Sequence, residues 1–311
     1  MKKMAKIMVT GASGLLGRAL IKQLGQNSQQ QIIACGYSRF GPNIERLDLT
    51  QAAQVSSFVA KHKPDIILHC AAERRPDVSE QDPQAALALN SEATQFLTQA
   101  ASQHGAWLLY ISTDYVFDGS QSPYREDAET NPVNFYGQSK LKGELVVSDA
   151  QQGFAILRLP ILYGEVESLN ESAVMVLLNH LVDTAEQSID NWAIRSPTST
   201  ADVAAAITKM IALKQAGEPL AGHYHFSAKE TMTKYQMLLV MGELLGLATG
   251  HLIPVTSPTD SAKRPKDSTL SCERLVSLEI ESKVPFRIGF KRALQDSPCA
   301  AAYLKVDNVR S

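Results

Sequence analysis

The sequence feature that most constrains the fold is a glycine-rich stretch near the N-terminus, TGASGLLG, at residues 10–17. An apolar strand-like segment precedes it and a run with helical spacing of apolar residues follows it, which predicts strand, turn and helix. Its glycines allow a tight turn and close approach of a phosphate to the helix N-terminus. The stretch therefore predicts a dinucleotide pyrophosphate site. Its GxxGxxG spacing also suits a tight turn without a ligand.

Strand-like and helical segments alternate through the first half of the chain. Strand-like segments lie at 6–10, 31–36, 65–72, 106–112 and 154–164, and helical patterns lie at 15–24, 51–62, 84–104 and 136–148. This alternation is typical of a parallel sheet whose right-handed crossover helices cover both faces. We therefore predict an α/β fold, a Rossmann-type doubly wound parallel sheet.

The second half of the chain is less regular. It carries helical patterns at 171–186, 201–215 and 233–246, a short strand-like piece, HYHFS, and a loop rich in Pro and Ser at 254–268. We predict that residues 1–162 form a dinucleotide-binding Rossmann domain to which later segments return. Residues 163–311 are then mainly a smaller C-terminal α/β substrate-binding domain, and its last dozen residues indicate a flexible tail.

Composition narrows the class of partner. The chain has 311 residues and a formal net charge of −2, which gives no electrostatic footprint for nucleic acid or for an anionic membrane surface. Its longest apolar runs have strand length, so we expect a cytoplasmic protein without a membrane span. The four cysteines and seven histidines are dispersed, and we expect neither a disulfide framework nor a metal site.

The end of the second strand-like segment indicates which dinucleotide is bound. An NAD site carries an Asp or Glu about 20 residues after the glycines, where it holds the ribose 2′-OH. Here the chain reads CGYSRFG, with Tyr37, Ser38 and Arg39 and no carboxylate. A guanidinium pairs bidentately with a 2′-phosphate, and the Ser hydroxyl can donate to it. The segment therefore favours NADP(H) over NAD, and a solvated loop cation is the alternative for Arg39.

A second candidate contact to the cofactor follows another short strand-like piece. Asp48 and Leu49 stand there in the sequence RLDLT. The Asp48 carboxylate either accepts a hydrogen bond from the adenine amino group or caps the helix that begins near residue 51. The sequence does not separate these two roles.

Polar residues at one strand end and at one helix start indicate the reaction. The fourth strand-like segment ends in YISTDYVFDG, and a helix begins at NFYGQSKLKGE. Tyr136 and Lys140 are spaced i and i+4, so they share one face of that helix. A lysine near a phenol lowers the pKa of the phenol, which can then exchange a proton with a carbonyl oxygen during hydride transfer. A hydroxyl from Ser112 or Thr113 would hold that oxygen. YxxxK pairs are also common on ordinary helices.

These motifs resemble a known family. TGASGLLG, HCAA, STDYVFDG, YGQSKLKGE and the late RPKDSTL are similar to the extended short-chain dehydrogenase/reductases, and more narrowly to dTDP-4-dehydrorhamnose reductases, over nearly the whole chain. The resemblance implies a Rossmann domain with NADPH, a sugar-nucleotide substrate and a catalytic set of Thr113, Tyr136 and Lys140. The residues expected at the cofactor are Gly11, Ser13, Gly14, Leu15, Leu16, Gly17, Tyr37, Ser38, Arg39, Asp48, Leu49, Cys70, Ala71, Ala72, Arg74, Tyr136 and Lys140.

Two segments depart from the reductase pattern. After the third strand-like segment the chain reads AERRPDV, and after the fifth Ile161 stands where many reductases carry a bulky aromatic. AERRPDV, PILYGEVE, MTKYQM and PFRIG instead resemble the regulatory β subunit of methionine adenosyltransferase, an NADP-binding protein of the same fold. That resemblance implies a non-catalytic role with a methionine adenosyltransferase partner. It places Arg74 at the cofactor, with a salt bridge to a nearby carboxylate as the alternative. A homodimer is a further expectation.

Overall fold

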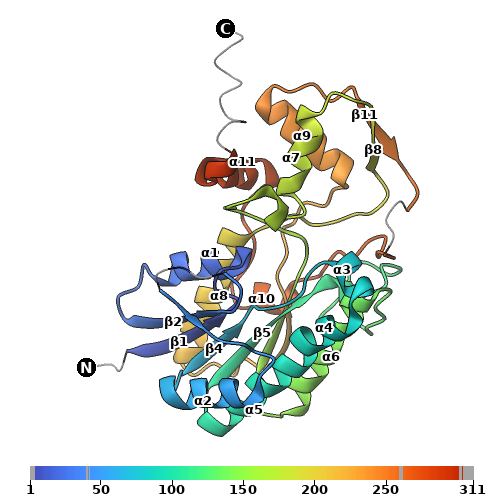
Figure 1. The fold of residues 1–311 in the computed structure, drawn as a ribbon. Helices are drawn as coiled ribbons and strands as arrows, with labels where there is room; N and C mark the ends of the chain where they lie inside the picture. The colour runs from blue at the N-terminus through green and yellow to red at the C-terminus, as the bar shows by residue number, and fades with distance from the viewer. Residues whose placement is uncertain (1–3, 40, 42, 259–261, 301–302, 304–311) are drawn as a thin grey trace.

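A parallel seven-stranded sheet forms the centre of the chain in a computed structural model, which describes residues 4–39, 41, 43–258, 262–300 and 303 (Figure 1). Its strand order is β10-β6-β5-β4-β1-β2-β3, with every neighbouring pair parallel. The strands are β1 (Ala5–Thr10), β2 (Gln30–Gly36), β3 (Ile44–Arg46), β4 (Ile66–His69), β5 (Trp107–Thr113), β6 (Ala155–Leu159) and β10 (Gly222–His225). The order reverses between β1 and β4, which is where such sheets bind ligands.

Helices cover both faces of the sheet, as Figure 1 shows. Helices α1 (Leu15–Leu24) and α8 (Thr200–Gln215) pack together on one face, and α2 (Ala52–His62), α5 (Ala93–His104) and α6 (Phe135–Asp149) cover the other. The predicted Rossmann-type doubly wound fold is therefore confirmed. Every strand-like segment predicted in the first half contributes to this sheet.

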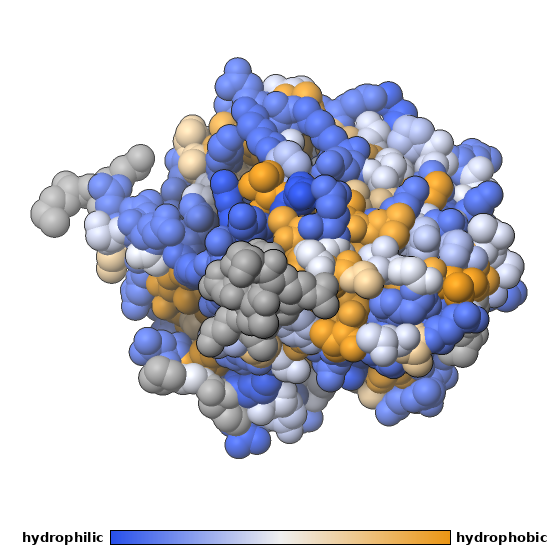
Figure 2. All heavy atoms as spheres, turned by 90° about the horizontal axis from the view of Figure 1, so that it is seen from above, coloured by the Kyte–Doolittle hydropathy of each residue, from blue (hydrophilic) through white to orange (hydrophobic). Residues whose placement is uncertain are grey.

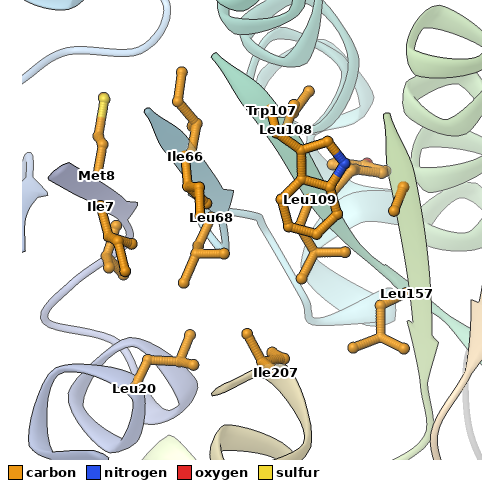
Figure 3. Packing of buried hydrophobic residues seen from close by; sticks show 14 of the residues in the cluster. Ile7, Met8, Leu20, Ile66, Leu68, Trp107, Leu108, Leu109, Leu157 and Ile207 are labelled. Atoms are coloured by element: carbon orange, nitrogen blue, oxygen red, sulfur yellow. The ribbon is translucent and has the colours of Figure 1, made fainter. Parts of the chain in front are cut away.

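The core of this sheet follows from strand and helix periodicity. Ile7 and Met8 point to opposite faces of β1, and both are fully buried (Figure 3). Leu20 of α1 and Ile207 of α8 lie opposite the strands and are equally buried. Fully burying one such side chain contributes about 1.5–3 kcal/mol. This core fixes the strand ends that carry the site.

A smaller lobe, built from the second half of the chain, lies at the carboxyl ends of the strands (Figure 1). Its elements are α7 (Leu178–Val182), β8 (Gln187–Asp190), α9 (Lys234–Leu245), β11 (Leu252–Val255) and α11 (Phe286–Asp296). They enclose a second apolar cluster that includes Met237, Met241, Phe286 and Phe290. Figure 2 views this end from above, where hydrophobic residues form small groups among hydrophilic ones.

Three predicted elements differ from the structure. The single helix at 84–104 is α4 (Pro83–Leu87), a π turn (Ala88–Glu92) and α5, and it is preceded by an unforeseen α3 (Pro76–Gln81). The buried Asn90 of the π turn donates to the Glu73 carbonyl and accepts from the Glu73 N–H, both at 2.9 Å. This pairing shows what the π turn achieves, because it ties the helix to the loop after β4.

The segments around residue 165 also differ. The strand at 154–164 is divided into β6 and β7 (Leu162–Tyr163) at Pro160, which has no N–H to donate to a ladder. The helix predicted at 171–186 is reduced to short 3₁₀ turns and α7, because the Ser172 hydroxyl accepts from Val174 N and Met175 N and competes with a helix. β7 pairs instead with β9 (Thr198–Ser199).

The two halves of the chain interlock. β10 comes from the second half and is an edge strand of the Rossmann sheet, and α8 and α10 (Glu273–Val276), also from the second half, pack on this sheet. The assignment of 1–162 to cofactor binding and of 163–311 to substrate binding stays a prediction. Apart from Ala300 and Tyr303, the predicted tail lies outside the described residues. Among the described residues, no helix is long and apolar enough to cross a membrane.

Candidate active site

The glycine turn joins the end of β1 to α1 and closely approaches the end of β4. Gly11 has a positive φ of 63°, and a Cβ there would lie 2.8 Å from Ala71 N. A Cβ on Gly17 would penetrate the Gly11 carbonyl oxygen, so only glycine lets the helix pack against the turn. Gly14 is the N-cap residue of α1. Gly11 and Gly17 are thus required by close contacts with backbone atoms, and Gly14 stands at the start of the helix.

The N-terminus of α1 fits an anionic group. No side chain among the described residues caps it, and its first turn carries no acidic residue. Its first N–H groups therefore point out of the turn together with the positive end of the helix dipole. Leu16 is buried in the sheet core, and Leu15 packs on the cluster of the smaller lobe. Ser13 lies beside Gly36, so the turn adjoins the end of β2.

The end of β2 places its three predicted residues on the surface. Tyr37, Ser38 and Arg39 are all exposed. Arg46 stacks over the Tyr37 ring, 5.4 Å from its centroid. The Arg39 guanidinium is not a free loop cation, because it pairs with the Glu171 carboxylate of the smaller lobe.

Asp48 and Leu49 lie next along this edge. One Asp48 carboxylate oxygen accepts from Thr50 N at 3.0 Å and from Thr50 Oγ1 at 2.7 Å. The N-cap residue of α2 is Gln51, so Asp48 orders the turn before the helix rather than its cap. Leu49 is buried in the sheet core. The contact between Asp48 and adenine stays a prediction.

The end of β4 brings the third predicted group to the same edge. Cys70 N and Ala71 N donate to Thr10 Oγ1 at 3.1 and 3.3 Å, which fixes the chain beside the glycine turn, with Ala72 next in line. Arg75 turns away and pairs with Glu73 at 2.6 Å. Arg74 instead reaches the Asn170 carbonyl at 3.5 Å.

The catalytic candidates converge at the end of β5 and the start of α6. The Asn134 side chain caps α6 by accepting from Gly137 N at 2.8 Å, which sets Tyr136 in the first turn. Thr113 ends β5 and its hydroxyl hydrogen-bonds toward Tyr136, whereas Ser112 donates to Glu144 at 2.5 Å. Strand alternation thus separates the two hydroxyls that the sequence left as alternatives, and Thr113 is the one beside Tyr136.

Tyr136 lies in an environment that keeps it protonated. Burial raises the pKa of Tyr136 above its usual value, while the hydrogen bond with Thr113 and the charge of Arg74 act in the opposite direction. The Tyr115 ring packs edge-on against it, with ring centroids 5.9 Å apart. The pKa of Tyr136 is thus raised, and the expectation that Lys140 would lower it is wrong. Tyr136 is therefore an acid that can give up a proton, rather than a preformed phenolate.

Lys140 lies one turn further along α6 and is buried. Its Nζ donates to the Ile111 carbonyl at 2.8 Å and lies 3.9 Å from the centroid of the Tyr110 ring. Burial lowers the pKa of Lys140 to about 7, and the Glu144 charge opposes that change. Lys140 therefore titrates close to neutral pH.

Comparison with known proteins decides the family. Residues 4–299 match the RmlD substrate binding domain family. The chain belongs to this family. Methionine adenosyltransferase 2 subunit beta of Xenopus tropicalis is 42% identical over 291 residues, which cover 93% of this chain and 87% of that protein. The dTDP-4-dehydrorhamnose reductase of Streptomyces griseus is 36% identical over 279 residues, which cover 88% of each. Both resemblances drawn from the sequence are thus confirmed.

A solved structure extends the agreement. The dTDP-4-dehydrorhamnose reductase of Bacillus anthracis, in complex with NADP, is 29% identical and superposes with a TM-score of 0.80. The alignment covers 94% of this chain and 98% of that one.

Sequence reasoning missed several polar residues of this RmlD-family site. Asp114 is buried, and its carboxylate accepts hydrogen bonds from the Thr113 hydroxyl at 3.1 Å and from the Ser268 hydroxyl. Arg195, also buried, donates to the Tyr115 hydroxyl at 3.4 Å and lies over its ring. Asp114 and Ser268 stand inside the motifs STDYVFDG and RPKDSTL, so the motifs carried the signal. Arg195 stands in an irregular segment with no such signal.

Proposed function

We propose that this RmlD-family chain is an NADPH-dependent reductase of a keto-sugar nucleotide of the dTDP-4-dehydrorhamnose type. The observation that carries the proposal is the meeting of Thr113, at the end of β5, with Tyr136, in the first turn of α6. In the proposal, residues 1–162 hold the cofactor, residues 163–311 mainly hold the substrate, and the protein is cytoplasmic.

The residues at the sheet edge fit NADP(H). The uncapped α1 N-terminus would hold the pyrophosphate, and Arg39 would pair with the 2′-phosphate. Bound there, the cofactor supplies a hydride. The solved Bacillus anthracis relative is in complex with NADP, which supports NADP(H) as the cofactor.

The chain's own residues supply the proton. Tyr136, kept protonated by burial, donates its phenolic proton to the carbonyl oxygen, which becomes a hydroxyl. Thr113 orients that oxygen by a hydrogen bond. Lys140, in its charged form, stabilises the phenolate that remains on Tyr136.

The experiment that tests this proposal measures NADPH consumption at 340 nm with dTDP-4-dehydro-6-deoxy-L-mannose. We expect turnover in the natural protein. In Tyr136→Phe we expect a loss of about 10²–10⁴-fold, the usual contribution of a general acid, with NADPH still bound. Turnover that survives in Tyr136→Phe would disprove the mechanism.

A second function is favoured by one specific observation. The chain is 42% identical to the methionine adenosyltransferase β subunit of Xenopus tropicalis, against 36% to the reductase of Streptomyces griseus. It is then an NADP-binding regulatory partner of a methionine adenosyltransferase, with Arg74 at the cofactor. Mixing the protein with a purified methionine adenosyltransferase tests this role. A stable complex with altered synthetase kinetics, and no sugar-nucleotide reduction, would select it. A homodimer stays a prediction under either function.

A further inference from the structure

An acidic strap crosses the cofactor edge of the sheet. We use this name for residues 165–172, EVESLNES, which follow β7 and lead into the smaller lobe. The Glu171 carboxylate accepts from Arg18 Nη2 at 2.6 Å and from Arg18 Nη1 at 3.3 Å, and it also pairs with Arg39. The Glu171 side chain is only 11% exposed. One carboxylate therefore bridges two guanidiniums.

The two arginines come from the two halves of the expected cofactor site. Arg18 belongs to α1 and donates to the Ser13 carbonyl at 2.7 Å, so it is anchored to the glycine turn. Arg39 follows the end of β2, where the 2′-phosphate of NADP is expected. Glu171 thus lies where these arginines would otherwise meet an anionic group of a ligand.

We propose that Glu171 is a specificity-determining residue that competes with the 2′-phosphate of NADP for Arg18 and Arg39. This inference rests on the proposed cofactor site. A phosphate carries up to two negative charges and three acceptor oxygens, so it outcompetes a single carboxylate for two guanidiniums. The neutral 2′-OH of NAD cannot displace Glu171. NADP binding therefore releases the strap, and NAD binding leaves it in place.

The competition lowers the apparent affinity for NADP. The apparent dissociation constant equals the intrinsic one divided by the fraction of molecules whose arginines are free. Removing the Glu171 charge raises that fraction. The affinity for NAD does not depend on it, because NAD makes no use of the arginines.

The experiment compares Glu171→Gln with the natural protein by calorimetry, using NADPH, NADH, adenosine 2′,5′-bisphosphate and AMP. We expect the dissociation constants of NADPH and of the bisphosphate to fall about tenfold, as the free fraction rises. Those of NADH and AMP should change less than about twofold, since only the 2′-phosphate senses the competition. The bisphosphate and AMP isolate the 2′-phosphate from the rest of the cofactor.

Glu167→Gln is the matched control, because it removes the same charge from the same strap. Its side chain is 68% exposed, and its carboxylate lies 3.7 Å from Arg18 and 3.9 Å from Arg39. We expect it to change NADPH affinity less than about twofold, as exposed charges are screened. If Glu171→Gln unfolds, Glu171→Asp retracts the carboxylate by one methylene and should shift NADPH affinity in the same direction.

Four results would overturn the inference. Weaker NADPH binding in Glu171→Gln would mean that Glu171 positions the arginines for the phosphate. Equal tightening in Glu167→Gln would reduce the effect to net charge. If natural protein and variants all failed to bind NADPH, the proposed function would fall, and the inference with it. Tight NADPH binding that is indifferent to Glu171 would contradict only the inference.

Discussion

The glycine turn and the acidic strap meet at Arg18, yet they are held in place by different forces. The turn is fixed by backbone sterics, since a side chain on Gly11 or Gly17 would enter neighbouring backbone. The acidic residues of the strap are tied to the sheet edge by side-chain charge pairs, of which Glu171 with Arg18 is the most buried. Steric contacts between residues that are close in the sequence can be predicted from a motif. Charge pairs between residues 153 positions apart cannot.

The largest effect is expected for a substitution in the glycine turn. Gly17→Ala should lower stability by about 3 kcal/mol, because the new methyl group forces α1 away from the turn. NADPH binding should be lost as well. Gly250→Ala is the control, since a Cβ there meets nothing within 4 Å. Thermal unfolding and NADPH fluorescence measure both. A stable Gly17→Ala that still binds NADPH would show that the turn is not sterically fixed.

The next effect compares a buried charge pair with a charge pair of the strap. Glu144, on α6, is 1% exposed and pairs with Arg158 at 2.7 Å. Glu144→Gln should cost about 3 kcal/mol, since it leaves the Arg158 charge buried without its partner. Glu165→Gln, which breaks a strap pair with Lys22 whose side chains are 61% and 48% exposed, should cost at most about 1 kcal/mol. Urea unfolding of both variants tests this difference, and equal losses would contradict it.

The Glu144 carboxylate should also make the free energy of unfolding depend on pH in the acid range. Burial would raise the pKa of Glu144, but hydrogen bonds from His223, Arg158 and Ser112 outweigh burial and hold the pKa at about 2. The pKa of Glu144 is lower in the folded protein than in the unfolded chain. Its contribution to the free energy of unfolding is therefore complete above the unfolded pKa. It is lost as pH falls through about 2. Urea unfolding against pH should therefore show a smaller acid loss in Glu144→Gln than in the natural protein. If Glu144→Gln lost as much stability at acid pH as the natural protein, other groups would be responsible for that loss.

The smallest effect concerns Lys140. Its pKa is lowered by burial to about 7, so its charge fades as pH rises from 6 to 8. Because the cofactor is anionic, the NADPH dissociation constant should rise over this range by up to about tenfold. Lys140→Met should give a flat profile, whereas Lys142→Met, at an exposed position of the same helix, should keep the slope. A slope that persists in Lys140→Met would assign the titration elsewhere.

The sheet and the turn were predictable because each depends on short sequence patterns. The apolar strands, the glycine stretch and the Tyr136 and Lys140 pair all act within a few residues. The exact path after β6 was not predictable, because Pro160 interrupts the strand pattern and the Ser172 hydroxyl overrides the helical pattern that follows. The partner of Arg39 was equally hidden, since the prediction offered only a phosphate or solvent.

Arg74 shows the same division between local pattern and fold. The sequence placed it at the cofactor or in a salt bridge to a carboxylate. In the structure, the neighbouring Arg75 makes the close salt bridge, with Glu73, and Arg74 reaches the strap carbonyl of Asn170. Which of two adjacent arginines reaches the strap depends on the path of the loop, which no spacing rule fixes. The contact of Arg74 with the cofactor stays a prediction.

NADPH oxidation with dTDP-4-dehydro-6-deoxy-L-mannose, measured beside Tyr136→Phe, is the sharpest test of the proposed reductase function. We predict steady consumption by the natural protein and a loss of about 10²–10⁴-fold in the variant, with NADPH binding unchanged. Tight NADPH binding without any oxidation, in a protein that instead alters a methionine adenosyltransferase, would contradict it.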